Sequence, residues 1–214
     1  MNEPAGFDTG MRKLYNTLCQ DFIYPDPINN LIFLDNHDMT RFFLSVGRDV
    51  RKLKMGLAFL LTTRGIPQLY YGTELLMDGD GGYHPNVRKD FPGGWPGDNT
   101  DGFTSAGLTA GQTEVYEYLK KLLIWRKSQP LIHAGKLLHY IPHDNVYVYF
   151  RYDAKKCVMV VLNANDSEKT LDTERFSQPL KKFTNGKDVI TGNEWQLTST
   201  IKILPWAVLI LALE

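Results

Sequence analysis

The sequence predicts an α/β segment followed by an all-β domain, and two observations predict it. In the first part of the chain, short apolar runs alternate with segments that carry apolar residues on one helical face. Beyond Pro130 the pattern changes to short strand-like runs separated by turn residues, which is typical of an antiparallel β-sandwich. We therefore predict a first domain over residues 1–130 and a second over residues 131–214.

Composition excludes several classes of protein. Of the 214 residues 43% are hydrophobic, which is enough for a sizeable core and excludes a disordered or collagen-like chain. The 24 basic residues balance 24 acidic ones, so we predict neither nucleic acid nor a membrane as a partner. Cys19 and Cys157 form no metal-ligand pattern, and we interpret them as packed thiols. The first ten residues show no secretory signal, and the compartment stays unassigned.

The first domain contains a strand–helix–strand unit. The apolar run Leu31–Leu34 predicts a buried strand, and residues 49–63 predict a helix because their leucines recur on one face. A second strand is expected at Gln68–Tyr71. A helix that connects two consecutive strands makes them parallel neighbours in one sheet. An amphipathic helix at Met11–Phe22 is expected to lead into the first strand.

A long irregular segment, Met77–Gly107, follows the second strand. It is dense in glycine, proline and aspartate and contains four aromatic residues. Irregular segments of this length are uncommon inside compact domains and are usually functional. Thr109 and Gln112 then have the spacing of a capping box, which predicts a helix that continues to Lys127.

The second domain is predicted to consist of short antiparallel strands. Turn residues such as Asn163–Asp166 and Gly192-Asn193 separate its apolar runs. The predicted strands are Lys136–Ile141, Asn145–Tyr152, Cys157–Asn163, Asp188–Thr191, Ile201–Leu204 and Trp206–Leu213.

Two motifs in the first domain resemble the α-amylase family of glycoside hydrolases. The string Phe33–Arg41, which contains Asn-His-Asp, resembles the block just past the seventh strand of that family's (β/α)₈ barrel. Gly65–Glu74 resembles the block at the eighth strand, and a helix of suitable length separates the two. The resemblance implies that the chain is the C-terminal part of a (β/α)₈ TIM barrel, about its last two strands with their helices, followed by an antiparallel β-sandwich.

A third motif implies a substrate class. The string His84–Trp95 is similar to the neopullulanase and cyclomaltodextrinase branch of the family. This similarity implies retaining cleavage of α-glucosidic bonds in starch-derived oligosaccharides, pullulan or cyclodextrins. The implied partner is therefore an α-glucan oligosaccharide.

The resemblance also implies roles for individual residues. Asp38 is expected to stabilise the transition state, because a carboxylate aimed at the ring hydroxyls can bind the distorted sugar more tightly than the relaxed one. His37 is expected to hydrogen bond to the same sugar, with Asn36 beside it. The simpler alternative for this block is a turn at the end of a strand, capped by Asn or Asp.

The remaining candidates each have a structural alternative. Arg41 is interpreted either as a partner that orients carboxylates and so assists substrate binding, or as a surface cation. Arg88, Asp90 and Trp95 are predicted to contact sugar, through hydrogen bonds or through the flat face of the indole. Alternatively, these residues stabilise a long loop. Glu74 is expected to fix its loop.

Two carboxylates needed for retaining hydrolysis have no counterpart in the chain. The nucleophilic Asp and the acid/base Glu lie after earlier strands in the family, and nothing before Leu31 resembles those blocks. We therefore expect the chain alone to be inactive. No cofactor or metal is expected here, because the calcium ligands that are common in the family belong to other parts of the full-length parent.

The incomplete barrel has a structural consequence. The first predicted strand has an unpaired edge, so we expect self-association or pairing with the missing N-terminal barrel half. A function of another class, a non-catalytic carbohydrate-binding or interaction module, would use the sandwich and the aromatic loop instead.

Overall fold

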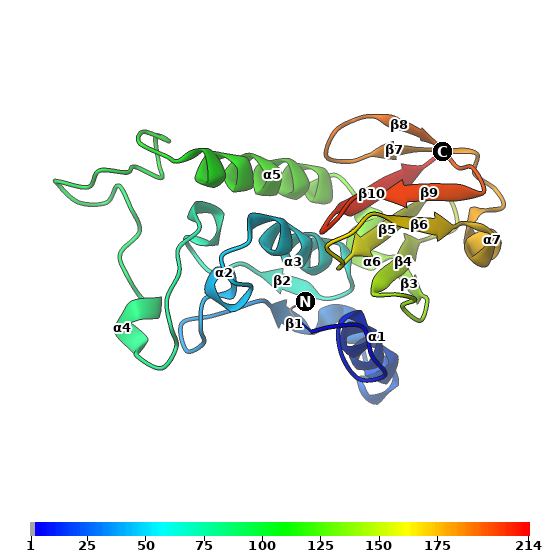
Figure 1. The fold of residues 1–214 in the computed structure, drawn as a ribbon, viewed down its shortest axis with the longest axis horizontal. Coiled ribbons are helices and arrows are strands. Elements are labelled where there is room, and N and C mark those ends of the chain that lie inside the picture. The colour runs from blue at the N-terminus through cyan, green and yellow to red at the C-terminus, as the bar shows by residue number, and fades with distance from the viewer. Residues whose placement is uncertain (1–2) are drawn as a thin grey trace.

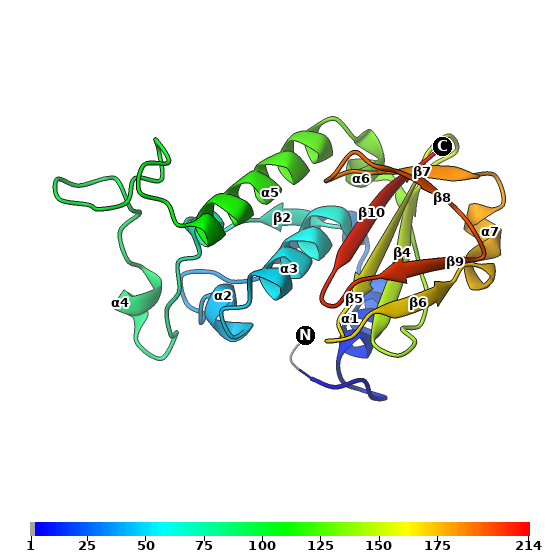
Figure 2. The ribbon, with the colours of Figure 1, turned by 45° about the horizontal axis from the view of Figure 1, so that its top comes forward.

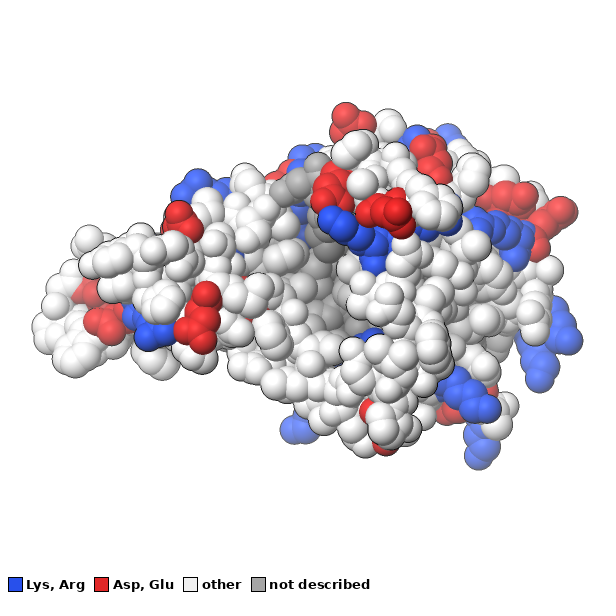
Figure 3. All heavy atoms as spheres, turned by 90° about the horizontal axis from the view of Figure 1, so that it is seen from below, with Lys and Arg blue, Asp and Glu red and all other residues white. Residues whose placement is uncertain are grey.

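The computed structural model describes residues 3–214. An α/β region occupies one end of the molecule and a β-sheet region the other, and α1 packs beside the β-sheet region (Figure 1). On the face shown in Figure 3, positive and negative side chains are interspersed, in agreement with the zero net charge. None of the helices between residues 3 and 214 has the length and apolar character that crossing a membrane requires.

Two short parallel strands and two long helices build the α/β region. Strand β1 (Leu31–Phe33) pairs in parallel with β2 (Ile66–Gln68), and α3 (Val50–Thr62) connects them. This confirms the predicted strand–helix–strand unit. The second strand is shorter than predicted and begins earlier, because Tyr70 and Tyr71 leave the sheet and stack with each other, their ring centroids 4.7 Å apart.

The helix α5 (Ala110–Lys127) lies alongside α3 (Figures 1 and 2). Its predicted capping box is confirmed: the Thr109 side chain accepts from the Gln112 backbone N–H, and the Gln112 side chain accepts from the Thr109 N–H. The remaining elements of this region are short: α1 (Met11–Leu18), η1 (Cys19–Ile23), η2 (Pro27–Asn29), α2 (Phe42–Ser45), η3 (Thr73–Leu75) and α4 (His84–Val87).

The β-sheet region contains a six-stranded antiparallel sheet, preceded by the short helix α6 (Pro130–Ala134). The strand order is β3–β4–β5–β10–β7–β8. The central strands β4, β5 and β10 are mostly apolar and buried on both faces, and the apolar runs in their sequences predict this. The bounds are β3 (Lys136–His139), β4 (Val146–Tyr152), β5 (Cys157–Asn163), β7 (Asn185–Asp188), β8 (Glu194–Gln196) and β10 (Val208–Leu213).

A second, two-stranded sheet covers one face of the first. Strand β6 (Lys169–Asp172) pairs with β9 (Thr200–Ile203), and their buried Leu171, Ile201 and Ile203 join the apolar cluster beneath β4 and β5. This arrangement confirms the sandwich. Between β6 and β7 the chain forms η4 (Glu174–Phe176) and α7 (Ser177–Leu180).

The predicted strand Asp188–Thr191 is wrong. The strand spans Asn185–Asp188 instead, and the Asp188 side chain accepts from the Ile190 backbone N–H to begin a turn. Strands β6 and β8 were not predicted, because their polar residues alternate with few apolar ones and lie at the rim of the fold.

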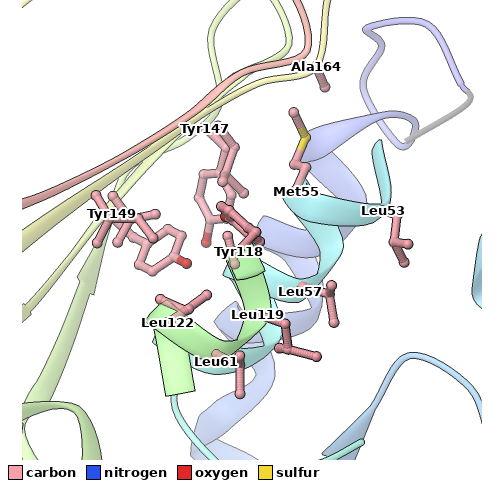
Figure 4. Packing of buried hydrophobic residues seen from close by; sticks show 14 of the residues in the cluster. Leu53, Met55, Leu57, Leu61, Tyr118, Leu119, Leu122, Tyr147, Tyr149 and Ala164 are labelled. Atoms are coloured by element: carbon pink, nitrogen blue, oxygen red, sulfur yellow. The ribbon is translucent and has the colours of Figure 1, made fainter. Parts of the chain in front are cut away.

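A shared core joins the two regions. Tyr147 and Tyr149 of β4 extend from the sheet toward Tyr118 and Leu122 of α5 and toward α3 (Figure 4). The Tyr149 hydroxyl lies 2.5 Å from Thr62 Oγ1 at the end of α3. Apolar packing of this kind contributes roughly 1.5–3 kcal/mol for each fully buried side chain. The β-sheet region is therefore packed as part of one structure with the helices.

Buried arginines cap the carboxyl end of α3. Arg151 of β4 is fully buried and donates to the carbonyls of Thr63 and Gly135 at 2.6 and 2.8 Å. Arg126 of α5 donates to the carbonyl of Leu61 at 2.6 Å. The last carbonyls of a helix have no partner within the helix and carry partial negative charge, so cations stabilise them.

One face of the two-stranded sheet is bare. The side chains of Leu31, Phe33 and Ile66 point away from the helices and are 57%, 41% and 50% exposed. Within residues 3–214, neither outer edge of this sheet has a partner strand. The predicted unpaired edge is thus confirmed for the described part of the chain; the predicted association through it stays a prediction.

Candidate active site

The candidate site begins where β1 ends. The chain leaves the strand at Leu34, and Asp35 turns inward and is buried. Its carboxylate accepts a 2.7 Å hydrogen bond from the Phe42 N–H and so anchors the start of α2. Burial raises the pKa of Asp35, while the Phe42 N–H and the positive charge of Arg41 lower it. Asp35 therefore fixes both ends of the intervening loop.

The loop between Asp35 and Arg41 presents three polar side chains. Asn36 Oδ1 accepts from the Asp38 N–H at 2.9 Å, so Asn36 forms the turn that the structural alternative predicted for this block. This bond orients the following residues outward. His37 and Asp38 both have more than half of their side-chain surface exposed, and His37 Nε2 lies 3.2 Å from Asp38 Oδ2.

Arg88 holds the Asp38 carboxylate from the other side. Its Nη2 donates to Asp38 Oδ1 at 2.7 Å, and its Nε donates to the His37 carbonyl at 3.0 Å. These two contacts come from one planar guanidinium, which fixes its orientation. The structure thus places Arg88 next to His37 and Asp38, two predicted site residues that lie 51 and 50 positions earlier in the sequence.

Arg41 is a buried residue that supports two loops. It is 1% exposed, so its interpretation as a surface cation is wrong. Its guanidinium donates to the carbonyls of Tyr71 and Val87 at 2.6 and 3.1 Å, and its Cζ lies 3.8 Å from the centroid of the Tyr70 ring. Among the described residues, one of its nitrogens, Nη2, has no hydrogen-bond partner. Arg41 therefore supports the backbone segments that carry Tyr71 and Val87.

Close backbone contacts attach the loop of Arg88 to the loop of Asp38. A Cβ atom at Gly81 would lie 2.5 Å from the Thr40 nitrogen, and one at Gly79 would lie 2.2 Å from the Asn86 carbonyl oxygen. Larger residues therefore do not fit at either glycine. The Arg41 N–H also donates to the Gly79 carbonyl at 2.9 Å. This packing explains why Arg88 reaches Asp38.

The rest of the long segment forms a projecting arm over residues 91–107 (Figure 2). Asp98 Oδ2 accepts from the N–H groups of Gly93 and Trp95, and the Asp101 carboxylate accepts from Phe103 and Thr104. These bonds order the arm without regular secondary structure. The Trp95 side chain remains 65% exposed, and its flat face is accessible to a ligand.

The other predicted residues differ in their surroundings. Asp90 is exposed and lines a hollow of about 280 Å³ with Phe91 and Asp98. Glu74 lies on η3, next to the Leu75 carbonyl, which accepts from the Gln112 side chain at 2.9 Å. The structure does not join Asp90 or Trp95 to Asp38 by any hydrogen bond among the described residues.

Sequence reasoning missed three residues that shape this site. Asp35 and the pair Tyr70-Tyr71 lie within three residues after the end of a strand, at the edge where parallel sheets carry their functional groups. Their position just after a strand was the feature of the sequence that could have identified them. Tyr71 also donates from its hydroxyl to the Lys89 carbonyl at 2.7 Å, which adds a second attachment for the Arg88 loop.

Comparisons with known proteins assign the two regions. Residues 8–91 match the family model of the α-amylase catalytic domain, and residues 137–212 match that of the cyclo-malto-dextrinase C-terminal domain. A cyclomaltodextrin glucanotransferase of Geobacillus stearothermophilus is 34% identical over 189 residues, which is 86% of this chain and 24% of that protein. The homologues of this chain are α-amylase-family glycosidases.

Solved structures agree with this assignment. An Anoxybacillus α-amylase has a TM-score of 0.76 at 25% identity, covering 96% of this chain and 43% of that one. The three-domain cyclomaltodextrin glucanotransferase CldA has a TM-score of 0.74 at 27% identity, covering 97% of this chain and 41% of that one. The chain spans about a quarter of the length of the curated relatives it matches.

Two cations surround the Asp78 carboxylate at this end of the molecule. Asp78 pairs with Arg48 at 2.5 Å and lies 3.9 Å from Lys89 Nζ. In the part of the chain that the structure describes, there is no group of three or more His, Cys, Asp or Glu side chains that could hold a metal ion.

Proposed function

We propose that this chain carries one edge of the active site of a retaining glycosidase that cleaves α-glucosidic bonds in starch-derived oligosaccharides, pullulan or cyclodextrins. The observation that carries the proposal is the exposed Asp38 carboxylate, which lies beyond the carboxyl end of β1 between His37 and Arg88. Active sites of such barrels lie at this end of the strands. Homology to α-amylase-family glycosidases supports the substrate class.

In this proposal Asp38 stabilises the transition state. Cleavage of a glycosidic bond develops oxocarbenium-like positive charge and flattens the sugar ring. Hydrogen bonds from the ring hydroxyls to a fixed carboxylate are stronger in this distorted state than in the relaxed sugar, so they lower the barrier. His37 hydrogen bonds to the same sugar. Arg88 keeps the Asp38 carboxylate oriented and donates a hydrogen bond to a neighbouring hydroxyl group of the sugar.

Further sugar contacts come from the segment around the projecting arm. Trp95 offers a flat apolar surface for a sugar ring, and Asp90 accepts hydrogen bonds from hydroxyl groups. Asn36 and Arg41 support sugar binding indirectly. Asn36 forms the turn that positions Asp38, and Arg41 holds the backbone of Tyr71. The order within the arm supports this role, because a preorganised loop loses little freedom on binding.

The finer assignment within the family is the neopullulanase and cyclomaltodextrinase branch. The string His84–Trp95 supports it, and so does the match of residues 137–212 to the cyclo-malto-dextrinase C-terminal domain. We propose no cofactor for this chain and assign calcium, which is common in the family, to other parts of a full-length parent.

We further propose that this chain alone does not hydrolyse α-glucans. Retaining hydrolysis needs a nucleophile and a general acid/base in addition to a stabilising carboxylate. The test is release of reducing sugar from maltoheptaose, β-cyclodextrin and pullulan, with Asp38→Asn as the control. We expect no release. Turnover that disappears in Asp38→Asn would show that another carboxylate pair completes the site.

A binding measurement tests the sugar contacts independently of turnover. Maltoheptaose is titrated into the whole chain by calorimetry, and Trp95→Ala is expected to weaken binding roughly tenfold, which corresponds to the loss of one stacking contact. Phe22→Ala, which truncates an exposed aromatic side chain elsewhere, should leave the affinity unchanged. Equal affinities of the parent and Trp95→Ala would remove Trp95 from the site.

A further inference from the structure

The β-sheet region contains a pocket that the proposed active site does not use. It has a volume of about 520 Å³ and lies between the β4–β5 hairpin and α7. Figure 1 shows α7 at the opposite end of the molecule from α4, whose end carries the Arg88 loop. The pocket is therefore remote from Asp38.

Lysines surround this pocket. Lys155 and Lys156 come from the hairpin, and Lys181 and Lys182 follow α7. All four are exposed, and none forms an ion pair with a carboxylate in the part of the chain that the structure describes. The chain as a whole has zero net charge, so four unpaired cations around one hollow form a local concentration of positive charge that the sequence alone did not reveal.

The one acidic residue of the pocket is already engaged. Asp153 Oδ1 accepts from the backbone N–H groups of Lys155 and Lys156, both at 2.7 Å. These bonds lower the pKa of Asp153, so its carboxylate stays ionised and closes the hairpin turn. One carboxylate against four ammonium groups leaves the pocket with a net positive charge of about three at neutral pH.

Part of the lining of the pocket is apolar. Leu138 of β3 and the buried Cys157 of β5 form part of the lining, and the half-buried rings of Tyr152 and Phe183 complete it. Burial raises the pKa of the Cys157 thiol to about 12, so it is uncharged at neutral pH and adds no negative charge. The pocket thus combines cations at its rim with aromatic and aliphatic surface inside.

We propose that this pocket binds a small phosphate ester that carries a ring of sugar size. Lysine ammonium groups bind phosphate as mobile point charges, and aromatic side chains provide flat surface for a ring. The volume lies within the range of small-molecule sites, roughly 300–1,000 Å³. A neutral oligosaccharide would leave the four ammonium groups without a partner, so the charge selects an anionic ligand.

Calorimetry with the whole chain tests the proposal at low and at physiological salt. Glucose 6-phosphate, inorganic phosphate and glucose are titrated separately. We expect saturable binding of glucose 6-phosphate, binding of phosphate at least about fivefold weaker, and none of glucose. Binding should weaken as salt rises, because ions screen the lysines. Absence of saturable glucose 6-phosphate binding overturns the proposal, and phosphate binding of equal strength overturns the contribution of the ring.

A matched pair of double variants separates this pocket from general surface charge. Replacing Lys155→Gln and Lys156→Gln should weaken glucose 6-phosphate binding at least tenfold, which corresponds to the loss of one to two charge-assisted contacts. Lys120→Gln with Lys121→Gln removes the same charge from an exposed pair on α5 and should leave binding unchanged. Equal weakening by the two double variants overturns the assignment to the pocket. Circular dichroism checks that both variants keep the fold.

Discussion

The two sheets of this molecule show how differently apolar strands can be used. Nearly every residue of β4 and β5 is buried, because helices cover one face of the six-stranded sheet and β6 and β9 cover the other. Strands β1 and β2 are covered on one face only, and their alternate side chains are exposed. The difference shows that an apolar run identifies a strand but that its neighbours decide whether it is buried. Stability is therefore concentrated in the β-sheet region and its contact with α3 and α5.

The largest expected effect is a difference in stability between two phenylalanine variants, one in the six-stranded sheet and one in the β1–β2 sheet. Phe150→Ala removes a fully buried ring that contacts Tyr140 and Phe176, and it should lower the free energy of unfolding by about 4 kcal/mol. Phe33→Ala truncates the same side chain on the bare face and should change it by less than about 1 kcal/mol. Urea unfolding followed by circular dichroism measures both. Similar losses in the two variants would contradict the comparison.

The next effect tests the connection between the two regions. Arg151→Met leaves the carbonyls of Thr63 and Gly135 buried without a donor, so we expect a loss of about 3 kcal/mol in the free energy of unfolding. The loss should exceed that of the exposed control Lys121→Met on α5, which is expected to be below about 0.5 kcal/mol. Thermal unfolding of the two variants provides the check. An unchanged midpoint in Arg151→Met would show that the arginine cap does not hold α3 to the sheet.

The bare face itself should govern association. Leu31→Glu puts a charge on the exposed face of β1 and should lower the self-association constant about tenfold, because burying a leucine contributes roughly 1.5–3 kcal/mol. Leu204→Glu, at an exposed leucine of the β-sheet region, is the control and should have no effect. Sedimentation velocity over a range of concentrations measures the constant. A parent chain that sediments as a single stable monomer would contradict the expected association.

The smallest effect is a pH dependence at the contact between α1 and the sheet. Burial lowers the pKa of His139 below its usual value of 6.5; Asp21 opposes this shift and Arg64 adds to it. The imidazole also packs against Tyr15 and hydrogen bonds to the Tyr147 hydroxyl at 2.8 Å. Since the unfolded state takes up this proton first, stability should fall as pH decreases from 6.5 toward the lowered pKa.

His139→Gln should reduce that slope, as measured by urea midpoints at pH 7.5 and pH 5. His84→Gln, which replaces an exposed histidine, serves as the control. If the slope is the same in the parent and in His139→Gln, other groups carry the acid dependence.

The sequence by itself determined the parts of the fold that depend on local pattern. Leucine spacing predicted α3, the Thr109–Gln112 box predicted the start of α5, and continuous apolar runs predicted β4 and β5. The family motif also indicated Asp38 and its neighbours. These features need only a few consecutive residues, because helix periodicity and capping are local.

The tertiary structure decided what depends on residues that are distant in sequence. It buried Arg41 against Tyr70, joined Arg88 to Asp38, and gathered four lysines around one pocket. It also ended β2 before the tyrosines and formed β6 and β8 from polar segments. Long side chains contact their partners only when the backbone has brought separate loops together, so no local sequence pattern predicts these contacts. Burial and pairing are properties of the whole packed chain.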